Sequence, residues 1–331
     1  MRLKINEKKL PPYKSKLMKR ELTVIIPFLN EGNEIHNTLE SIRQTAGDEV
    51  QIILINDAST DQVDYESVAK EFGCKYIHNT ERQGVARSRD IGVENTETDC
   101  VLLLDGHMRC YSNHWHTDIL AAITQDEEAI YCCTCRQTDG TNILADANNY
   151  GAFLTFWGDA YDKILEPKWI CDSYMQNVKE DIVEIPCILG ASYAFTKDYW
   201  QRLQGLEGLR FYGSDEAYIS LKAWMSGGSC KLIKSVEIGH IFRDVAPYPT
   251  KISDIAYNKL LIAQLLFDEN ERKRTFELLK KASPEQYNKS KFLLDMQEDE
   301  IAEMEAKLKP VLKHNLTYFQ ERINRHFETA S

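Results

Sequence analysis

The stretch VLLLDGH at residues 101–107 decides the fold and poses the question of function. Its apolar run predicts a buried strand, bounded by Asp99 before it and Gly106 after it. Asp105 and His107 stand two positions apart at its end, and a strand turns such residues to one face. A carboxylate and an imidazole that converge suit a divalent ion such as Mn²⁺. A turn-forming aspartate beside a surface histidine is the alternative interpretation.

The residues before this stretch alternate between two patterns. Apolar runs predict strands and amphipathic runs predict helices, in the order strand 21–27, helix 33–44, strand 50–57, helix 63–73, strand 75–79 and helix 84–95. This alternation predicts an α/β fold with a mostly parallel sheet and helices on both faces. Ligands of such sheets bind at the carboxyl ends of the strands, where Asp57 and Asp105 both lie.

The rest of the chain divides into an aromatic-rich part and a helical tail. Residues 107–250 contain one clear helix, predicted within 211–228, and from about residue 250 the sequence is helical and polar. Pro310 interrupts the heptad-like spacing of the tail, so we expect packing onto the domain in place of a long coiled coil. We therefore expect an N-terminal arm (1–20), an α/β domain (21–267) and a helical extension (268–331).

Composition excludes several classes of protein. A net charge of −11 argues against nucleic-acid binding, which requires a basic face. No apolar stretch has the length of a signal peptide or a membrane span. The nine cysteines lie mostly in apolar runs such as AIYCCTC at 129–135, which predicts reduced, buried thiols in a cytoplasmic protein. The tail could form a dimer contact, a membrane-surface helix or core packing, and we favour packing because its charges of both signs alternate.

A second histidine strengthens the metal hypothesis. His240 lies inside the strand-like run VEIGHIFR (236–243), with Arg243 three residues later. A histidine in an apolar strand is usually a satisfied core residue. Here, however, a metal and an arginine at strand ends would make a clamp for a diphosphate, since a guanidinium grips phosphate in a fork.

Three further groups of polar residues allow two interpretations each. Asp215 and Glu216 precede an apolar helical stripe, where they either favour the helix N-terminus or act on a hydroxyl. Asp57, in NDASTD, either forms a turn or accepts hydrogen bonds from a nucleobase or ribose. Three arginines in RQGVARSR (82–89) form a solvated face, or one of them reaches the phosphates or sugar of a ligand.

Taken together, these segments resemble a known family. TVIIPFLNEGNEIHNTLESI, ILINDASTD, RQGVARSRDIGV and LLLDGH resemble the nucleotide-sugar half of a GT-A fold glycosyltransferase. IPCILGASYAFTKDYW, FYGSDEAYISLKAWMSGG and IGHIFRDVAPY are similar to the catalytic domain of the polypeptide N-acetylgalactosaminyltransferases and their bacterial relatives within the family 2 group. The resemblance covers residues 21–267 in collinear order.

The resemblance implies a UDP-sugar donor and a Mn²⁺ (or Mg²⁺) ion. It implies metal ligation by Asp105, His107 and His240, and donor binding by Pro27, Asn30, Glu31, Asp57, Arg82, Arg89, Asp105, Gly190, Ala191, Arg243 and Tyr248. Within that set, Asp57 matches a uracil contact, Arg89 a residue near the donor sugar and Arg243 a diphosphate contact. Gly190 and Ala191 match backbone positions beside the sugar, and Tyr248 lies in a loop that closes over the donor in the family.

The sequence also departs from the family's pattern. The family's Trp-Gly-Gly-Glu-Asn reads Tyr-Gly-Ser-Asp-Glu at 212–216, so Asp215 replaces a sugar-contacting Glu and Glu216 replaces an Asn. In inverting relatives the position of Glu216 holds an acid that acts as the catalytic base, so we favour inversion with Glu216 as base. The mucin-type enzymes have no such base and retain the anomeric configuration. Ala246 stands where the family often has a histidine. No lectin domain or membrane anchor is recognised, so we expect neither a Golgi location nor a mucin acceptor.

We therefore expect a cytoplasmic bacterial enzyme, at most peripheral to the inner membrane, that moves a hexose or N-acetylhexosamine from UDP to an acceptor hydroxyl in polysaccharide biosynthesis. The acceptor stays open between a glycan, a lipid-linked sugar and a peptide, and the C-terminal helices could form a homo-oligomer. A retaining GalNAc-type transferase and a nucleotide-binding module without transfer activity are the alternatives. A nucleotidyltransferase is disfavoured, because PFLNEGNE carries neither a lysine nor a glycine pair after the first strand.

Overall fold

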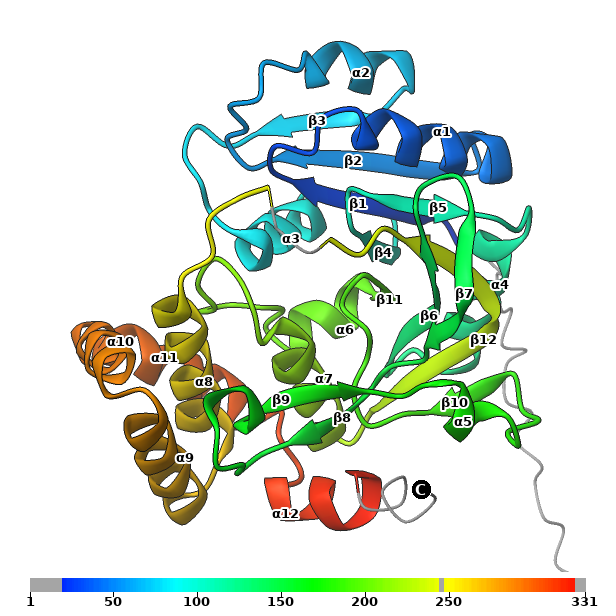
Figure 1. The fold of residues 1–331 in the computed structure, drawn as a ribbon. Coiled ribbons are helices and arrows are strands. Elements are labelled where there is room, and N and C mark those ends of the chain that lie inside the picture. Colours follow the sequence, from blue (N-terminus) through cyan, green and yellow to red (C-terminus); the bar gives the residue numbers. More distant parts are fainter. Residues whose placement is uncertain (1–19, 244–246, 325–331) are drawn as a thin grey trace, which may run out of the picture.

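A computed structural model describes residues 20–243 and 247–324 (Figure 1). The N-terminal half alternates strands and helices as the sequence predicts. Its elements are β1 Leu22–Phe28, α1 Glu34–Ala46, β2 Val50–Asn56, α2 Tyr65–Glu71, β3 Lys75–His78, α3 Val85–Glu94 and β4 Cys100–Leu104. The predicted N-terminal arm, Arg20 excepted, and Ala246 lie outside the described residues.

The middle of the chain holds more elements than the sequence indicates. They are β5 Met108–Cys110, α4 Trp115–Gln125, β6 Ala129–Thr138, β7 Ile143–Asn149, β8 Ala152–Thr155, the 3₁₀ turn η1 Tyr161–Lys163, β9 Glu166–Trp169, α5 Asp172–Met175, β10 Ile182–Glu184, β11 Ser192–Thr196, α6 Lys197–Arg202, α7 Asp215–Met225 and β12 Ser229–His240. The prediction of a single clear helix in this part is therefore wrong. Helix α4 was not predicted, although its buried face is formed by Trp115, Ile119, Ala122 and Ile123.

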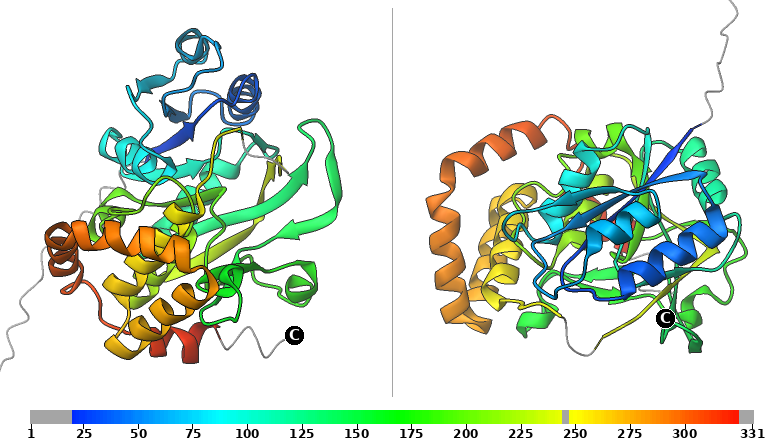
Figure 2. Two further views of the ribbon diagram at one scale, coloured as in Figure 1. Left: turned by 60° about the vertical axis from the view of Figure 1, so that its left-hand side comes forward. Right: turned by 90° about the horizontal axis from the view of Figure 1, so that it is seen from above.

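Ten strands of the described residues form one mixed sheet in the order β10-β12-β6-β11-β4-β1-β2-β3, with β5 added to β12 and β7 to β6. Strands β3, β2, β1 and β4 are parallel to one another, and helices cover both faces (Figures 1 and 2). This confirms the predicted α/β class. Strand β11 runs antiparallel between β4 and β6, so β6 and its parallel neighbour β12 run in the same direction as β4. The carboxyl ends of β1, β2, β4 and β12 therefore meet at one edge.

One predicted strand boundary is wrong for a backbone reason. Strand β1 continues through Pro27 to Phe28, because pairing with β4 stops at Ile25 and the proline lies where that side of the strand is unpaired.

Helix α7 lies within the predicted stretch 211–228 and begins at Asp215. The residues before it, Phe211 (φ 32°), Gly213 (φ 93°) and Ser214 (φ 67°), have left-handed backbones that an α-helix cannot contain.

The C-terminal helices are α8 Ile252–Leu266, α9 Glu269–Ala282, α10 Pro284–Met296, α11 Glu298–Leu308 and α12 Leu316–Phe319, followed by a π-helical turn, Gln320–Asn324. Helices α9, α10 and α11 pack on α8, and α8 and α12 contact α7 (Figure 2). The backbone N–H groups of Lys313 and His314 donate to Met225 O, which caps the last turn of α7. The tail thus packs onto the α/β part, as expected from its sequence.

No helix among residues 20–243 and 247–324 combines the length and the apolar composition that a membrane span requires. This agrees with the sequence, in which no such segment is found.

The start of α3 touches the segment that precedes α7. Gly84 has φ +89°, and a Cβ there would lie 2.2 Å from the Cα of Phe211. Val85 N also donates to Phe211 O at 2.8 Å. Only glycine permits two backbones to approach so closely.

We predict that Gly84→Ala lowers the free energy of unfolding by about 3 kcal/mol or more, because strain at positive φ adds to a backbone clash. Gly73→Ala is the matched control: its φ is +63°, but a Cβ there meets nothing within 4 Å, so we expect a loss of about 1 kcal/mol. Urea unfolding of both variants measures the difference. Equal losses would contradict the proposed role of the contact with Phe211.

Candidate functional site

A cavity of about 490 Å³ opens at the shared edge of the strands. Its volume lies in the range of small-molecule sites. Residues from β1, β9, β12, α3, α7 and α8 line it, together with residues of the loops that follow β1, β2, β4 and β12 and that precede α3, β11 and α7. Of the residues predicted from the sequence, the lining includes Pro27, Glu31, Asp57, Arg82, Arg89, Asp105, His107, Gly190, Ala191, Asp215, Glu216, His240, Arg243 and Tyr248.

Asn30 does not line the cavity. With φ 56° its side chain turns toward the neighbouring loop, where its Oδ1 accepts from Thr60 N at 2.7 Å. Its own N–H donates to Ser59 Oγ at 2.9 Å. These bonds explain the residue as a brace between two loops, and the geometry gives no support to its predicted donor contact.

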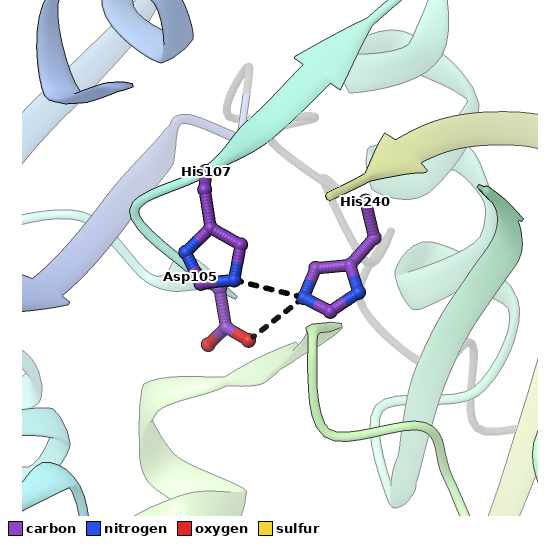
Figure 3. A group of neighbouring side chains, drawn as sticks. All are labelled: Asp105, His107 and His240. Atoms are coloured by element: carbon purple, nitrogen blue, oxygen red, sulfur yellow. Dashed lines mark hydrogen bonds and ion pairs between the residues drawn. The ribbon is translucent and has the colours of Figure 1, made fainter. Parts of the chain in front are cut away.

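Asp105, His107 and His240 converge at one wall of the cavity (Figure 3). One ligand atom from each lies within 4.8 Å of the other two. The two Nε2 atoms are 3.1 Å apart, and His240 Nε2 is 3.7 Å from Asp105 Oδ2. Two ligand atoms at neighbouring corners of an octahedron with bonds of about 2.1 Å lie about 3 Å apart. The spacing of the two imidazole nitrogens therefore fits neighbouring ligands of a single cation, while the Asp105 carboxylate lies somewhat farther away.

The route to this convergence differs from the prediction. Strand β4 ends at Leu104, and Asp105, Gly106 and His107 form a turn, so the strand alternation invoked for them is wrong. His240 is the last residue of β12 and not an interior one. It meets His107 because β5 pairs antiparallel with β12 and places His240 opposite Met108. Ile241 N then donates to His107 O at 3.2 Å.

Protonation states also suit cation binding. Burial, together with the positive charges of His107 and Arg243, lowers the pKa of His240 to about 3, so its imidazole is neutral at pH 7. Glu31 is buried, and its Oε2 lies 3.2 Å from His107 Nδ1. Burial alone would raise the pKa of Glu31, but His107 and Arg243 lower it below its usual range. A carboxylate on the far ring nitrogen directs Nε2 toward a metal.

Arg89 joins the metal-facing carboxylate to the start of α7. Its guanidinium donates to Asp105 Oδ1 at 3.1 Å and to Gly190 O at 2.9 Å, and it makes a short ion pair with Asp215. Arg89 is 3% exposed. Its predicted place near a donor sugar agrees with this position in the wall, although its side chain is fully engaged by protein.

Asp215 and Glu216 are the first two residues of α7 and both line the cavity, but their surroundings differ. Asp215 is paired with Arg89, whereas the carboxylate of Glu216 packs against the backbone of Gly190, where a Cβ would lie 2.4 Å from Oε1. Burial, followed by the charge of Asp215, raises the pKa of Glu216 well above its usual range. Such a carboxyl accepts and releases a proton at a higher pH than an ordinary glutamate does.

The other predicted donor residues take supporting positions. Arg243 donates to Glu31 Oε2 at 2.5 Å. Asp57 Oδ1 accepts from Asn79 Nδ2 at 2.9 Å and Gln83 N at 2.7 Å, while its Oδ2 accepts from Gly84 N at 2.8 Å. Asp57 therefore shapes the loop before α3 and also faces the cavity.

An aromatic and cationic group closes the mouth of the cavity. Arg82 donates to Pro249 O at 2.9 Å, and its Cζ lies 5.4 Å from the ring centroid of Phe211 and 5.6 Å from that of Tyr248. The rings of Tyr212 and Tyr248 are 6.0 Å apart. Residues around Tyr248 are thus held over the cavity by Arg82.

Several lining residues were missed from the sequence, namely Glu166, Pro167, Trp169, Phe211, Phe242 and Ile255. The run EPKW at 166–169 has no motif and no periodicity, so nothing marks it as part of a site. Asn79, which donates a hydrogen bond to Asp57, lies in no sequence motif that would have identified it either.

We predict that Arg89→Met lowers the free energy of unfolding by about 3–5 kcal/mol, because it leaves two buried carboxylates, Asp105 and Asp215, without their partner. The control is Arg87→Met on the same helix. Arg87 is exposed and pairs with Glu94, so its loss should cost less than about 1 kcal/mol. Denaturant unfolding checks both values, and a small loss for Arg89→Met would show that the carboxylates do not depend on it.

Comparison with known proteins places this cavity in a family. Residues 23–167 match the model of glycosyl transferase family 2. Polypeptide N-acetylgalactosaminyltransferase 10 of Mus musculus is 28% identical over 264 residues, which is 75% of this chain and 42% of the relative. The human counterpart is 27% identical over the same length and coverage. The chain thus spans less than half the length of these curated relatives.

Solved structures share the fold. A crystal structure of GalNAc-T7 with UDP, GalNAc and Mn²⁺ superposes with a TM-score of 0.74 and 18% identity, and covers 94% of this chain and 57% of that chain. Staphylococcus aureus TarS 1–349 with UDP-GlcNAc gives a TM-score of 0.51 and 13% identity, over 79% of this chain and 71% of that chain. Residues 23–167 are therefore similar to glycosyl transferase family 2, and the chain has a GT-A-like fold that resembles the catalytic domain of the polypeptide N-acetylgalactosaminyltransferases.

Proposed function

We propose that the protein is a metal-dependent glycosyltransferase that moves a hexose or N-acetylhexosamine from a UDP-sugar to an acceptor hydroxyl. The observation that carries the proposal is the convergence of Asp105, His107 and His240 on a cavity of about 490 Å³. The relatives and the GalNAc-T7 complex support a nucleotide-sugar donor with Mn²⁺. Two imidazoles in the donor set favour Mn²⁺ over Mg²⁺, which prefers oxygen ligands and water.

The chain's own residues would divide the work as follows. Asp105, His107 and His240 would hold the ion, which when bound neutralises charge on the diphosphate. Arg243 is positioned by Glu31, which also lies beside His107, and would bind a diphosphate oxygen. Preorganised cationic groups that face the developing charge of a leaving group supply the largest electrostatic contribution to catalysis.

Transfer itself would use the start of α7. An acceptor hydroxyl oxygen attacks the anomeric carbon, the bond from that carbon to the diphosphate oxygen breaks, and UDP leaves with the electron pair. We propose Glu216 as the base that takes the hydroxyl proton and Asp215 as a ligand of the donor sugar. A base opposite the leaving group favours inversion at the anomeric carbon. In a retaining reaction Glu216 would not act as the base for the acceptor hydroxyl.

A nucleotide-binding module without transfer activity remains the second candidate, since the cavity alone would account for binding. Measurement of UDP release from a panel of UDP-sugars, with and without Mn²⁺, separates the two functions. A transferase releases UDP only with the metal and a cognate sugar, and that sugar also raises the melting temperature by mass action. Binding without any release of UDP would favour the module.

The same assay tests the ion site through a residue that does not touch the ion. We predict that Glu31→Gln raises the Mn²⁺ concentration needed for UDP release roughly 10- to 100-fold, because His107 loses the carboxylate at its Nδ1. Glu34→Gln, which removes a carboxylate paired with Arg109, is the control and should leave this concentration unchanged. Equal responses of the two variants would count against the assignment of His107 as a ligand.

The pH dependence tests Glu216. Because the pKa of Glu216 is raised and the base must be deprotonated, kcat should fall as pH falls through a value above the usual range for glutamate. Glu216→Gln should lower kcat by roughly 100-fold or more and abolish this acid limb. An unchanged kcat and profile, with retention at the anomeric carbon, would remove Glu216 as base.

A further inference from the structure

One wall of the cavity has no counterpart among the residues assigned above. Strand β9 contributes Glu166, Pro167 and Trp169 to the lining, beside Tyr212 and Ile255. Strand β9 pairs with β8 in a two-stranded sheet separate from the main sheet, and Figure 1 shows this hairpin below the main sheet and beside α8. Strand β9 also contacts α7, the helix that begins with Asp215 and Glu216.

Two aromatic rings of this wall are open to solvent. Trp169 is 40% exposed and Tyr212 is 41% exposed, although both line the cavity. All five tryptophans of the chain lie in the described residues, and the other four are buried or half-buried. Large exposed aromatic surface at the mouth of a cavity marks a binding surface more often than a packing fault.

A buried lysine fixes the carboxylate next to this surface. Lys259 of α8 has a side chain that is 0% exposed, and its Nζ lies 2.5 Å from Glu166 Oε1 and 3.1 Å from Tyr161 O. The second oxygen of Glu166 makes no hydrogen bond to any residue in 20–243 or 247–324, and the side chain is 30% exposed. Glu166 is therefore held by one oxygen while the other is free to accept a hydrogen bond from a ligand.

The backbone of β9 is poorly suited to bind a peptide as an added strand. Ala152, the register partner of Trp169, donates its N–H to Cys187 O, away from β9. In an antiparallel pair the backbone groups of Trp169 and of Pro167 then point to the other edge of β9. Proline has no N–H, so this edge lacks a donor that strand addition requires.

From these features we infer that β9 forms the acceptor subsite and that the acceptor is a pyranose sugar, the terminal residue of a glycan. A pyranose has a flat face of C–H groups that would cover the Trp169 indole, and hydroxyl groups at its rim that would donate to Glu166. Glu166 and Trp169 line the same cavity as Glu216, so a sugar on β9 would occupy the cavity that α7 opens into. This inference rests on the proposed function and narrows its acceptor to a carbohydrate.

Binding is tested first without transfer. In the full chain with Mn²⁺ and UDP, titration with methyl β-D-glucopyranoside, methyl β-D-galactopyranoside and methyl N-acetyl-β-D-glucosaminide should change the tryptophan fluorescence, which reports on exposed Trp169. We expect saturation by at least one glycoside in the wild type and no change in Trp169→Ala. Phe292→Ala removes an aromatic that is 64% exposed on α10, away from the cavity, and should behave as the wild type.

Transfer kinetics with the glycoside that binds then test the proposed contacts of Trp169 and Glu166 with the acceptor sugar. Trp169→Ala and Glu166→Gln should each raise the acceptor KM roughly tenfold, the effect of about 1.4 kcal/mol. Phe292→Ala, whose side chain does not line the cavity, is the control and should leave the acceptor KM unchanged. The melting temperature of each variant establishes that it is folded.

Three outcomes overturn the inference. Acceleration of UDP release by serine- or threonine-containing peptides, with no glycoside active, would make the acceptor a peptide. An unchanged acceptor KM in both variants would place the acceptor elsewhere. An equal rise in the KM of Phe292→Ala would show a general effect of losing surface aromatics. Failure of the proposed function looks different, since the wild type would then release no UDP from any UDP-sugar.

Discussion

The site depends on one buried guanidinium. Arg89 reaches Asp105 beside the metal-facing histidines, Asp215 at the start of α7 and the carbonyl of Gly190. Asp105 and Asp215 are 110 residues apart in the sequence, and a carboxylate removed from water is stable there only with a partner. Burial raises the pKa of Asp105 even with this arginine present, which shows how costly its charge would be alone. The wall of Asp105, His107 and His240 and the start of α7 are thus fixed relative to each other by electrostatics.

Backbone constraints, in addition to Arg89, fix the position of α7. The segment before α7 has left-handed residues at Phe211 and Ser214, and it rests on Gly84 at the start of α3. Residues keep such a strained backbone conformation only where contacts with the surrounding structure hold them in it. Strained residues of this kind are common in functional segments. Here it turns the first residues of α7 toward the cavity. The C-terminal segment holds the other end of the same helix through Met225 O.

Local sequence signals predicted much of the fold and of the site, and their failures have physical causes. The parallel half was predictable because each strand and helix carries its own periodicity, and the ends of buried strands pointed to Asp57 and Asp105. The pairing of His107 with His240 was not predictable from spacing, since it arises from the antiparallel register of β5 and β12. The β9 wall escaped because Glu166 and Trp169 acquire meaning only through α8 and α7, which are remote in sequence. The donor role of Asn30 stays a prediction, since Asn30 braces a loop beside the cavity without lining it.

The adjacent carboxyls Asp215 and Glu216 show how one helix start supports two different tasks. Both stand in the positive field of the helix N-terminus, so that field does not distinguish them. The difference comes from their neighbours, because Asp215 faces Arg89 whereas Glu216 lies on the backbone of Gly190 beside the charge of Asp215. Burial and the nearby carboxylate of Asp215 raise the pKa of Glu216, since two like charges so close do not both ionise easily. The paired acid is then suited to hold a sugar hydroxyl, and the unpaired acid, with its raised pKa, to accept a proton. Arg89 therefore shapes the chemistry of the site as well as its geometry.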